Sequence, residues 1–97
     1  MARLSPEEIE KARAVPLDAA LERLGCFVSV DRDFQPRKNA ASVSVFVTDG
    51  NDTRELIMTG PKWFDKREGV GGGGAIDLAM HLKGWTLRQA VRALLKP

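Results

Sequence analysis

Apolar residues recur with two different spacings along the chain, and an alternating spacing indicates strands. Residues 42–48 alternate polar and apolar positions, which predicts a strand with its three valines on one face. Residues 49–52 have the composition of a hairpin turn, and residues 54–59 predict the antiparallel partner strand. Shorter apolar stretches at 26–30 and 62–64 indicate further strands beside this hairpin.

Helical spacing is found before these strands. Ser5 and Glu8 form a capping-box pattern with Pro6 at the first helical position, which predicts a short helix ending at about residue 13. Residues 16–24 carry leucine and alanine at i, i+3, i+4 and i+7, and Gly25 is placed to end this second helix.

Two more helices are predicted in the C-terminal part. Residues 75–83 are apolar on most sides, which indicates a central buried helix that ends at Gly84. Thr86 and Gln89 form a second capping-box pattern before an apolar stripe that continues to residue 95. The residues expected to form one common core are Ile76, Met80, Leu87, Val91 and Leu94, packed against Val43, Val45 and Leu56.

These elements together predict a single α+β domain over residues 1–97. Its small antiparallel sheet is expected to have three or four strands, flanked by two N-terminal and two C-terminal helices. Residues 1–14 are expected to form an N-terminal extension helix. A chain of 97 residues is long enough for one modest core but too short for a two-domain enzyme with a buried cofactor cleft.

Composition limits the classes of function. The formal net charge of +2 and the sequence pI near 9.0 are compatible with a polyanion partner if the positive residues cluster. The single cysteine, Cys26, excludes an intramolecular disulfide and a cysteine-rich zinc site, and it is more typical of a small buried hydrophobe than of a catalytic thiol. Because no apolar run approaches the length of a membrane span, we expect a soluble cytoplasmic protein without a membrane partner.

Four consecutive glycines, residues 71–74, stand directly before the predicted buried helix. Glycine tolerates positive φ and lets another backbone or a ligand come close, but ordering it costs conformational entropy. Two interpretations stay open: a structural joint between strand and helix, or a loop in which Gly71, Gly72 and Gly73 contact a phosphate at the helix N-terminus. Residues 69–74 also match the dinucleotide fingerprint G-x-G-x-x-G, but too little chain follows for the required βαβ unit.

Aromatic and basic residues lie together just before the glycines. Aromatic faces stack on unpaired bases while cations hold phosphates, so this cluster suits single-stranded nucleic acid. Trp63 and Phe64 are neighbours in a strand and must point to opposite faces, so one of them is core. Two interpretations of Trp63 therefore stay open: its ring stacks on a base, or it packs in the core. The basic residues expected to contact phosphates are Lys62, Lys66 and Arg67, extended by Arg37 and Lys38.

Catalytic and metal-binding groups are sparse. Asp77 and His81 lie at i and i+4 on one helix face, where they could offer two metal ligands or form a hydrogen bond. With no further histidine and no nearby cysteine, the hydrogen bond or an exposed face is favoured. No Ser/His/Asp or Cys/His arrangement is present, so we expect no catalytic residue, no metal and no cofactor.

Several local sequences carry a resemblance to a known family. They are Val15-Pro16-Leu17-Asp18, Ser42-Val43-Ser44-Val45, Trp63-Phe64, Gly74-Ala75-Ile76-Asp77-Leu78 and Thr86-Leu87-Arg88-Gln89-Ala90-Val91. Over about residues 14 to 95 the chain resembles the N-terminal zinc-ribbon domain of bacterial and phage DNA primases, and most closely the primase-like modules of plasmid and mobile-element proteins with a Toprim domain. That family binds zinc through a Cys-Pro-x-His pair and a Cys-x-x-Cys pair. The aligned positions here hold Gln35, Lys38, Lys66 and Gly69, and none of them is a zinc ligand.

The resemblance implies a metal-free module that binds single-stranded DNA through its sheet face and glycine loop. Because it lacks the catalytic carboxylates of primer synthesis, it implies a non-catalytic module acting with a Toprim, primase, polymerase or relaxase partner in replication or mobile-element transfer. Without zinc, the apolar core must hold the fold. The alternative is a protein-interaction domain that keeps the fold without binding DNA. Basic residues around an exposed Trp63 would favour DNA, whereas an exposed apolar patch would favour a protein partner.

Overall fold

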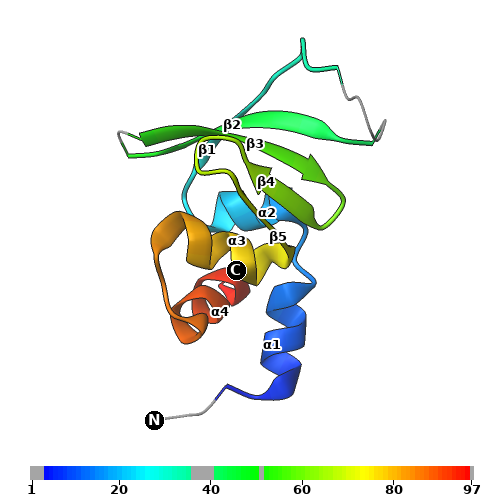
Figure 1. The fold of residues 1–97 in the computed structure, drawn as a ribbon. Coiled ribbons are helices and arrows are strands. Elements are labelled where there is room, and N and C mark those ends of the chain that lie inside the picture. The colour runs from blue at the N-terminus through cyan, green and yellow to red at the C-terminus, as the bar shows by residue number, and fades with distance from the viewer. Residues whose placement is uncertain (1–3, 36–40, 51, 97) are drawn as a thin grey trace.

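The computed structural model describes residues 4–35, 41–50 and 52–96, and it has an α+β fold (Figure 1). The elements in chain order are α1 (Pro6–Arg13), α2 (Leu17–Arg23), β1 (Phe27–Val30), β2 (Val43–Asp49), β3 (Asp52–Thr59), β4 (Lys62–Asp65), β5 (Val70–Gly73), α3 (Gly74–Lys83) and α4 (Leu87–Leu95). The predicted fold class is confirmed, but the sheet has five strands rather than three or four. The additional strand is β5, because the glycine run pairs with β4 before the chain enters α3.

The five strands form one antiparallel sheet in the order β1-β2-β3-β4-β5. All four helices lie on one side of this sheet (Figure 1). Helices α2 and α3 contact the strands, while α1 and α4 pack on α3. One face of the sheet is therefore covered by helices, and no helix of the described residues lies over the other. None of the helices in the described ranges is long and apolar enough to cross a membrane.

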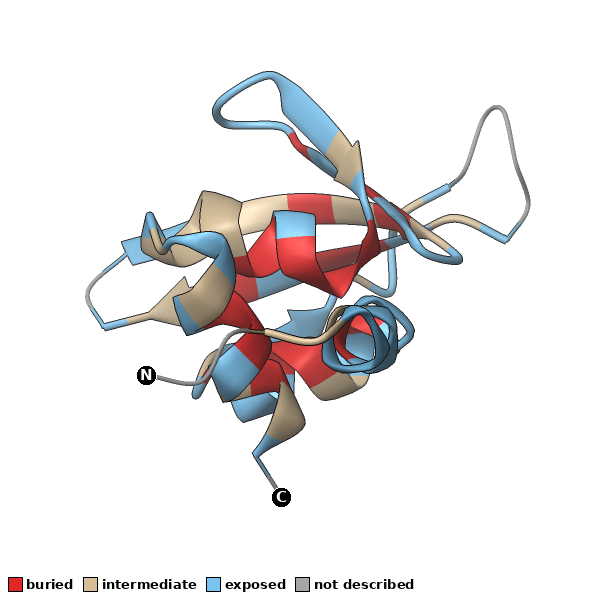
Figure 2. Cartoon of the chain, turned by 90° about the horizontal axis from the view of Figure 1, so that it is seen from below, coloured by how far each residue is buried: buried red, intermediate tan, exposed pale blue. Residues whose placement is uncertain are grey.

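Buried side chains form two clusters rather than the single core that we expected. Figure 2 shows the buried residues in red on both the strands and the helices. The cluster between sheet and helices contains Leu17, Leu21, Val45, Val47, Leu56, Met58, Trp63 and Leu78. The cluster among the helices contains Ala12, Ala20, Leu24, Ala75, Ile76, Ala79, Ala90, Val91 and Leu94, with Met80 partly buried against it. Both α2 and α3 contribute residues to the two clusters, and α3 can do so because it is apolar on most sides.

Two of the expected core residues are exposed. Val43 and Leu87 are 44% and 41% exposed, respectively. Each is the first residue of its element, where fewer packed neighbours surround a side chain than in the middle of the element. The predicted helix ends are confirmed, since both capping boxes are present and Gly25 and Gly84 have φ values of 76° and 68°.

Candidate nucleic-acid interface

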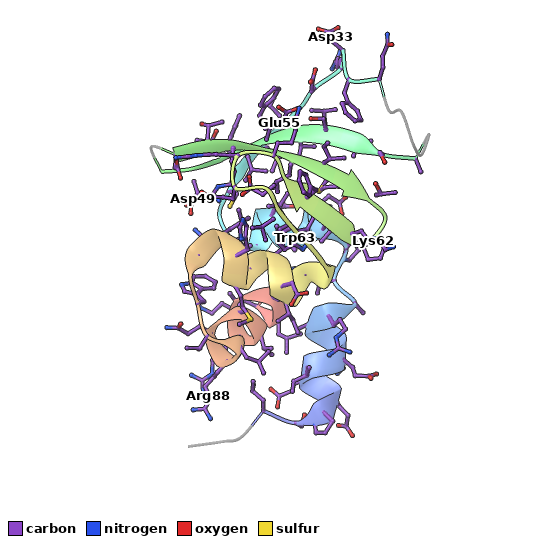
Figure 3. The ribbon with its side chains drawn as sticks, in the orientation of Figure 1. Asp33, Asp49, Glu55, Lys62, Trp63 and Arg88 are labelled. Carbon is purple, nitrogen blue, oxygen red and sulfur yellow. The ribbon has the colours of Figure 1, made fainter. Side chains whose placement is uncertain are left out.

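Strand β4 places Trp63 and Phe64 on opposite faces of the sheet, and Trp63 faces the helices. Its side chain is only 5% exposed, and its ring centroid lies 4.9 Å from that of His81 in α3. Figure 3 shows Trp63 between the sheet and the helices. The indole Nε1 is buried without a hydrogen-bond partner among the described residues. Trp63 is therefore not available to stack on a base, which corrects that expectation.

Three phenylalanine rings on the face without helices are available to a ligand. Phe27, Phe46 and Phe64 are 74%, 39% and 43% exposed. Successive side chains of a strand point to opposite faces of the sheet. The residues next to the buried Val45 in β2 and Leu56 in β3 therefore point away from the helices. We call this side the open face, and it comprises Phe27, Ser44, Phe46, Glu55, Ile57, Lys62 and Phe64.

Strand register sets the spacing of these rings. Phe46 pairs with Glu55, while Phe64 pairs with Ile57, two residues further along β3. Given the usual strand separation and rise, the Cα atoms of Phe46 and Phe64 should lie about 12 Å apart. At that distance each ring can receive a different base. Sequence reasoning missed Phe46, although its position between Val45 and Val47 already placed it opposite the predicted valine face.

The predicted basic residues are less free than the sequence suggested. Lys62 is exposed on the open face and has no ion-pair partner in the part of the chain that the structure describes. In contrast, Lys66 Nζ lies 3.5 Å from Glu55 Oε2, and the guanidinium of Arg67 pairs with Asp52. The positive charge near the aromatic rings is therefore partly neutralised. The other two predicted phosphate contacts, Arg37 and Lys38, lie outside the described residues.

Three of the four glycines in the run make close structural contacts. A Cβ added to Gly72 would lie 2.7 Å from Trp63 Cζ2, so glycine is needed there to admit the indole. Gly71 lies against the Phe64 side chain, since a Cβ there would be 3.2 Å from Phe64 Cδ1. Only Gly74 of the four has a positive φ, and its N–H donates to the Pro61 carbonyl at 2.7 Å. These contacts favour the first of the two interpretations of the glycine run, a structural joint between strand and helix.

The start of α3 already has an acidic group. The N–H of Gly73, the residue that precedes the helix, lies 3.5 Å from Asp77 Oδ2. The positive end of the helix dipole stabilises a negative group in the first turn, and the Asp77 carboxylate already lies there. Its negative charge makes the same position less favourable for a phosphate. The phosphate contacts predicted for Gly71, Gly72 and Gly73 therefore have no geometric support here.

A buried ionic network holds the turn between β4 and β5, and sequence reasoning missed it. Asp65 is fully buried on the helix side of the sheet. Its Oδ2 accepts from Arg54 Nη1 at 2.9 Å and lies 2.7 Å from His81 Nε2. Its Oδ1 accepts the backbone N–H groups of Arg67 at 2.9 Å and Glu68 at 3.2 Å. The position two residues after Trp63 in the same strand was the available signal that Asp65 faces inward.

These hydrogen bonds determine the ionisation of Asp65. Burial alone would raise the pKa of its carboxyl, but the bonds from His81, Arg54 and two backbone N–H groups outweigh burial and lower it. An ionised carboxylate only accepts, so His81 donates from Nε2. The expected hydrogen bond between His81 and Asp77 is thus corrected: the His81 side chain bonds to Asp65 of the sheet instead.

The turn of residues 66–69 joins β4 to β5 and is held by Asp65. Here the Asp65 carboxylate binds two N–H groups of this turn, and the Asp65 carbonyl accepts from the Gly69 N–H at 2.8 Å. Among the described residues there is no group of three or more histidine, cysteine, aspartate or glutamate side chains that could hold a metal ion. The turn is therefore fastened by a side chain of the protein itself.

Cys26 has the surroundings of a structural thiol. It is half-buried beside both apolar clusters, and burial raises its pKa above the ordinary value despite the nearby Lys83. A catalytic thiol requires the opposite shift, because the thiolate is the nucleophile. The prediction of a small buried hydrophobe agrees with this environment.

Comparisons of the chain with protein families, with curated protein sequences and with solved structures find no match.

Proposed function

We propose that the chain is a single-stranded DNA-binding module that stacks unpaired bases on Phe46 and Phe64 of its open face. The observation that supports this most directly is the exposure of both rings on the open face, which also carries Lys62 and has the Lys66 ammonium beside Glu55. Base stacking on an aromatic ring contributes about 1–3 kcal/mol per base and tolerates any sequence. Lysines beside the rings supply phosphate contacts.

This proposal moves the stacking surface from Trp63 to its neighbour. Lys62 lies two residues before Phe64 in β4 and therefore on the same face. Lys66 is 48% exposed, so it can contact a phosphate even while it is near Glu55. Following the sequence resemblance, the module would be non-catalytic and would act beside a primase, Toprim protein, polymerase or relaxase in replication or mobile-element transfer.

A protein-interaction domain is the second candidate, and exposed apolar residues at the edge strand β1 favour it. Phe27 and Val30 are 74% and 59% exposed there. An exposed apolar edge strand can pair with a strand of another chain. Such a partner would use β1, whereas the DNA proposal uses the lysines and rings of β2 and β4.

Fluorescence anisotropy with a labelled single-stranded oligonucleotide, titrated with salt, tests the proposal. Phe46→Ala and Phe64→Ala should each weaken binding by about 1–3 kcal/mol with little change in salt slope. Lys62→Ala should reduce the slope by about 0.7, as expected for the loss of one phosphate contact. Leu87→Ala is the matched control, because Leu87 is equally exposed but lies on α4.

Two results would replace this proposal by the protein-interaction reading. One is a parent protein without salt-dependent binding at low ionic strength. The other is a parent that binds but whose Phe46 and Phe64 variants bind equally well. Circular dichroism of each variant separates lost binding from lost folding.

A further inference from the structure

Glu55 lies in the middle of the open face, next to the proposed stacking rings. It pairs with Phe46 across β2 and β3, and the next residue of β3 on the same face, Ile57, pairs with Phe64. Figure 3 shows Glu55 on the side of the sheet away from the helices. A carboxylate at this position repels phosphates. On a surface that binds nucleic acid, this repulsion would have to be offset by a favourable contact between the carboxylate and the ligand.

In the part of the chain that the structure describes, contacts hold this carboxylate through one oxygen. Ser44 Oγ donates to Glu55 Oε2 at 2.7 Å, and Lys66 Nζ is 3.5 Å from the same atom. Ser44 is fully buried, so its hydroxyl is a constrained donor. Glu55 Oε1 has no hydrogen-bond partner among the described residues, and the side chain is 24% exposed. The result is an oriented carboxylate whose Oε1 no described residue occupies as a hydrogen-bond donor.

The chemistry of the bases decides what such an acceptor can recognise. A base lying on the Phe46 or Phe64 ring presents its edges along the sheet, toward neighbouring side chains. Cytosine, adenine and guanine carry exocyclic amino groups that donate, and glutamate characteristically accepts from cytosine N4. Thymine and uracil carry a carbonyl oxygen where cytosine has its amino group. Their one donor on that edge, N3–H, lies between two carbonyl oxygens, which repel a carboxylate.

We propose that Glu55 makes the open face selective for bases with an exocyclic amino group over thymine and uracil. This inference rests on the proposed binding of single strands by the same face. Phe46 and Phe64 bind the base plane and do not discriminate between bases, while Glu55 Oε1 accepts from its edge. One hydrogen bond to a charged acceptor corresponds to a preference of about tenfold.

Oligomers of 5-methyldeoxycytidine and of thymidine provide the sharpest test. Their bases differ only in the amino group and N3 of one against the carbonyl and N3–H of the other, so stacking area and phosphate charge are the same. The parent should bind the 5-methylcytosine oligomer roughly tenfold more tightly by anisotropy at fixed salt. Glu55→Gln keeps the shape and the contact with Ser44 but can also donate to a carbonyl. In this variant we expect the preference to fall to within about twofold.

Two further variants control for charge. Asp33→Asn removes one negative charge from the exposed segment above the same face, and it should leave the preference unchanged (Figure 3). Lys66→Ala removes the lysine beside Oε2 while leaving Oε1 in place, so it should lower the salt slope and keep the preference. Melting curves confirm that each variant is folded.

The possible failures are distinguishable. If the parent binds neither oligomer, the proposed function fails and this inference with it. If the parent binds both oligomers equally, or if Glu55→Gln keeps the full preference, the selectivity of Glu55 is refuted while single-strand binding stands.

Discussion

The two faces of the sheet present similar strand residues to opposite surroundings. On the covered face, Val45, Leu56 and Trp63 are at most 5% exposed, because α2 and α3 pack over them. On the open face, Phe46 and Phe64 are 39% and 43% exposed, although each is the direct chain neighbour of one of those buried residues. Whether an apolar side chain of the sheet is buried or exposed therefore depends on the face to which it points, and not on its residue type.

The carboxylates of the two faces differ in the same way. Asp65 on the covered face is surrounded by four hydrogen-bond donors, which come from β3, α3 and the following turn. Glu55 on the open face is bound through Oε2, and its Oε1 has no partner among the residues that the structure describes. A carboxylate with every partner inside the protein serves the fold, whereas one with a free oxygen on an exposed face can serve a ligand.

Replacing the two neighbouring aromatic residues should produce the largest difference between the faces. Trp63→Ala removes a buried indole and should lower the free energy of unfolding by about 3–5 kcal/mol. Phe64→Ala removes a half-exposed ring and should lower it by no more than about 1 kcal/mol. Urea unfolding measures both. Equal losses would mean that the open face is covered in solution.

Asp65→Asn should cost about 3 kcal/mol of unfolding free energy, because Arg54 and His81 then lose the charge that they surround. The matched control is Asp77→Asn, in which an exposed carboxylate with only a long contact to the Gly73 N–H is lost. That control should cost less than about 1 kcal/mol. Urea unfolding at neutral pH compares them, and similar losses would argue against a structural role of the Asp65 network.

Two glycines of β5 provide a finer comparison. Gly72→Ala puts a Cβ against the Trp63 ring, which must shift, and should cost about 1–3 kcal/mol. At Gly73 an added Cβ meets nothing within 4 Å and φ is −134°, so Gly73→Ala should change stability by no more than about 0.5 kcal/mol. Thermal melts resolve the difference. A neutral Gly72→Ala would show that the indole is not held against β5.

Acid should destabilise the covered face. The pKa of Asp65 is lowered below its ordinary value of 3.8, so the unfolded chain binds the proton more tightly than the folded one. The stability contributed by Asp65 is thus complete above about pH 4 and is lost as the pH falls through the folded pKa. Urea midpoints measured down the acid range should decline less steeply in Asp65→Asn than in the parent. Parallel declines would assign the acid sensitivity to other groups.

Removing metal should have the smallest effect. Asp65 fastens the turn at residues 66–69 from within the chain, so melting curves with and without a chelator should superimpose. Added zinc is the control and should not raise the melting temperature. A drop of several degrees with chelator, or stoichiometric zinc by elemental analysis, would contradict this expectation.

The sequence by itself determined most of the local structure. The capping boxes that begin at Ser5 and Thr86 and the alternation over residues 42–48 predicted elements that are present, because each depends on residues a few positions apart. The alternation within a strand also required Trp63 and Phe64 to face opposite ways. These features need no knowledge of distant parts of the chain.

Only the tertiary structure decided which face the helices cover. Both faces of the sheet offered apolar residues, so the pattern left open whether Trp63 or Phe64 was buried; the packing of α3 on the sheet settled it. The contact of Asp65 with His81 joins residues 16 positions apart on a strand and a helix, and no local spacing encodes it. The glycine run is understood in the same way, since Gly72 must be small only because the indole lies across it.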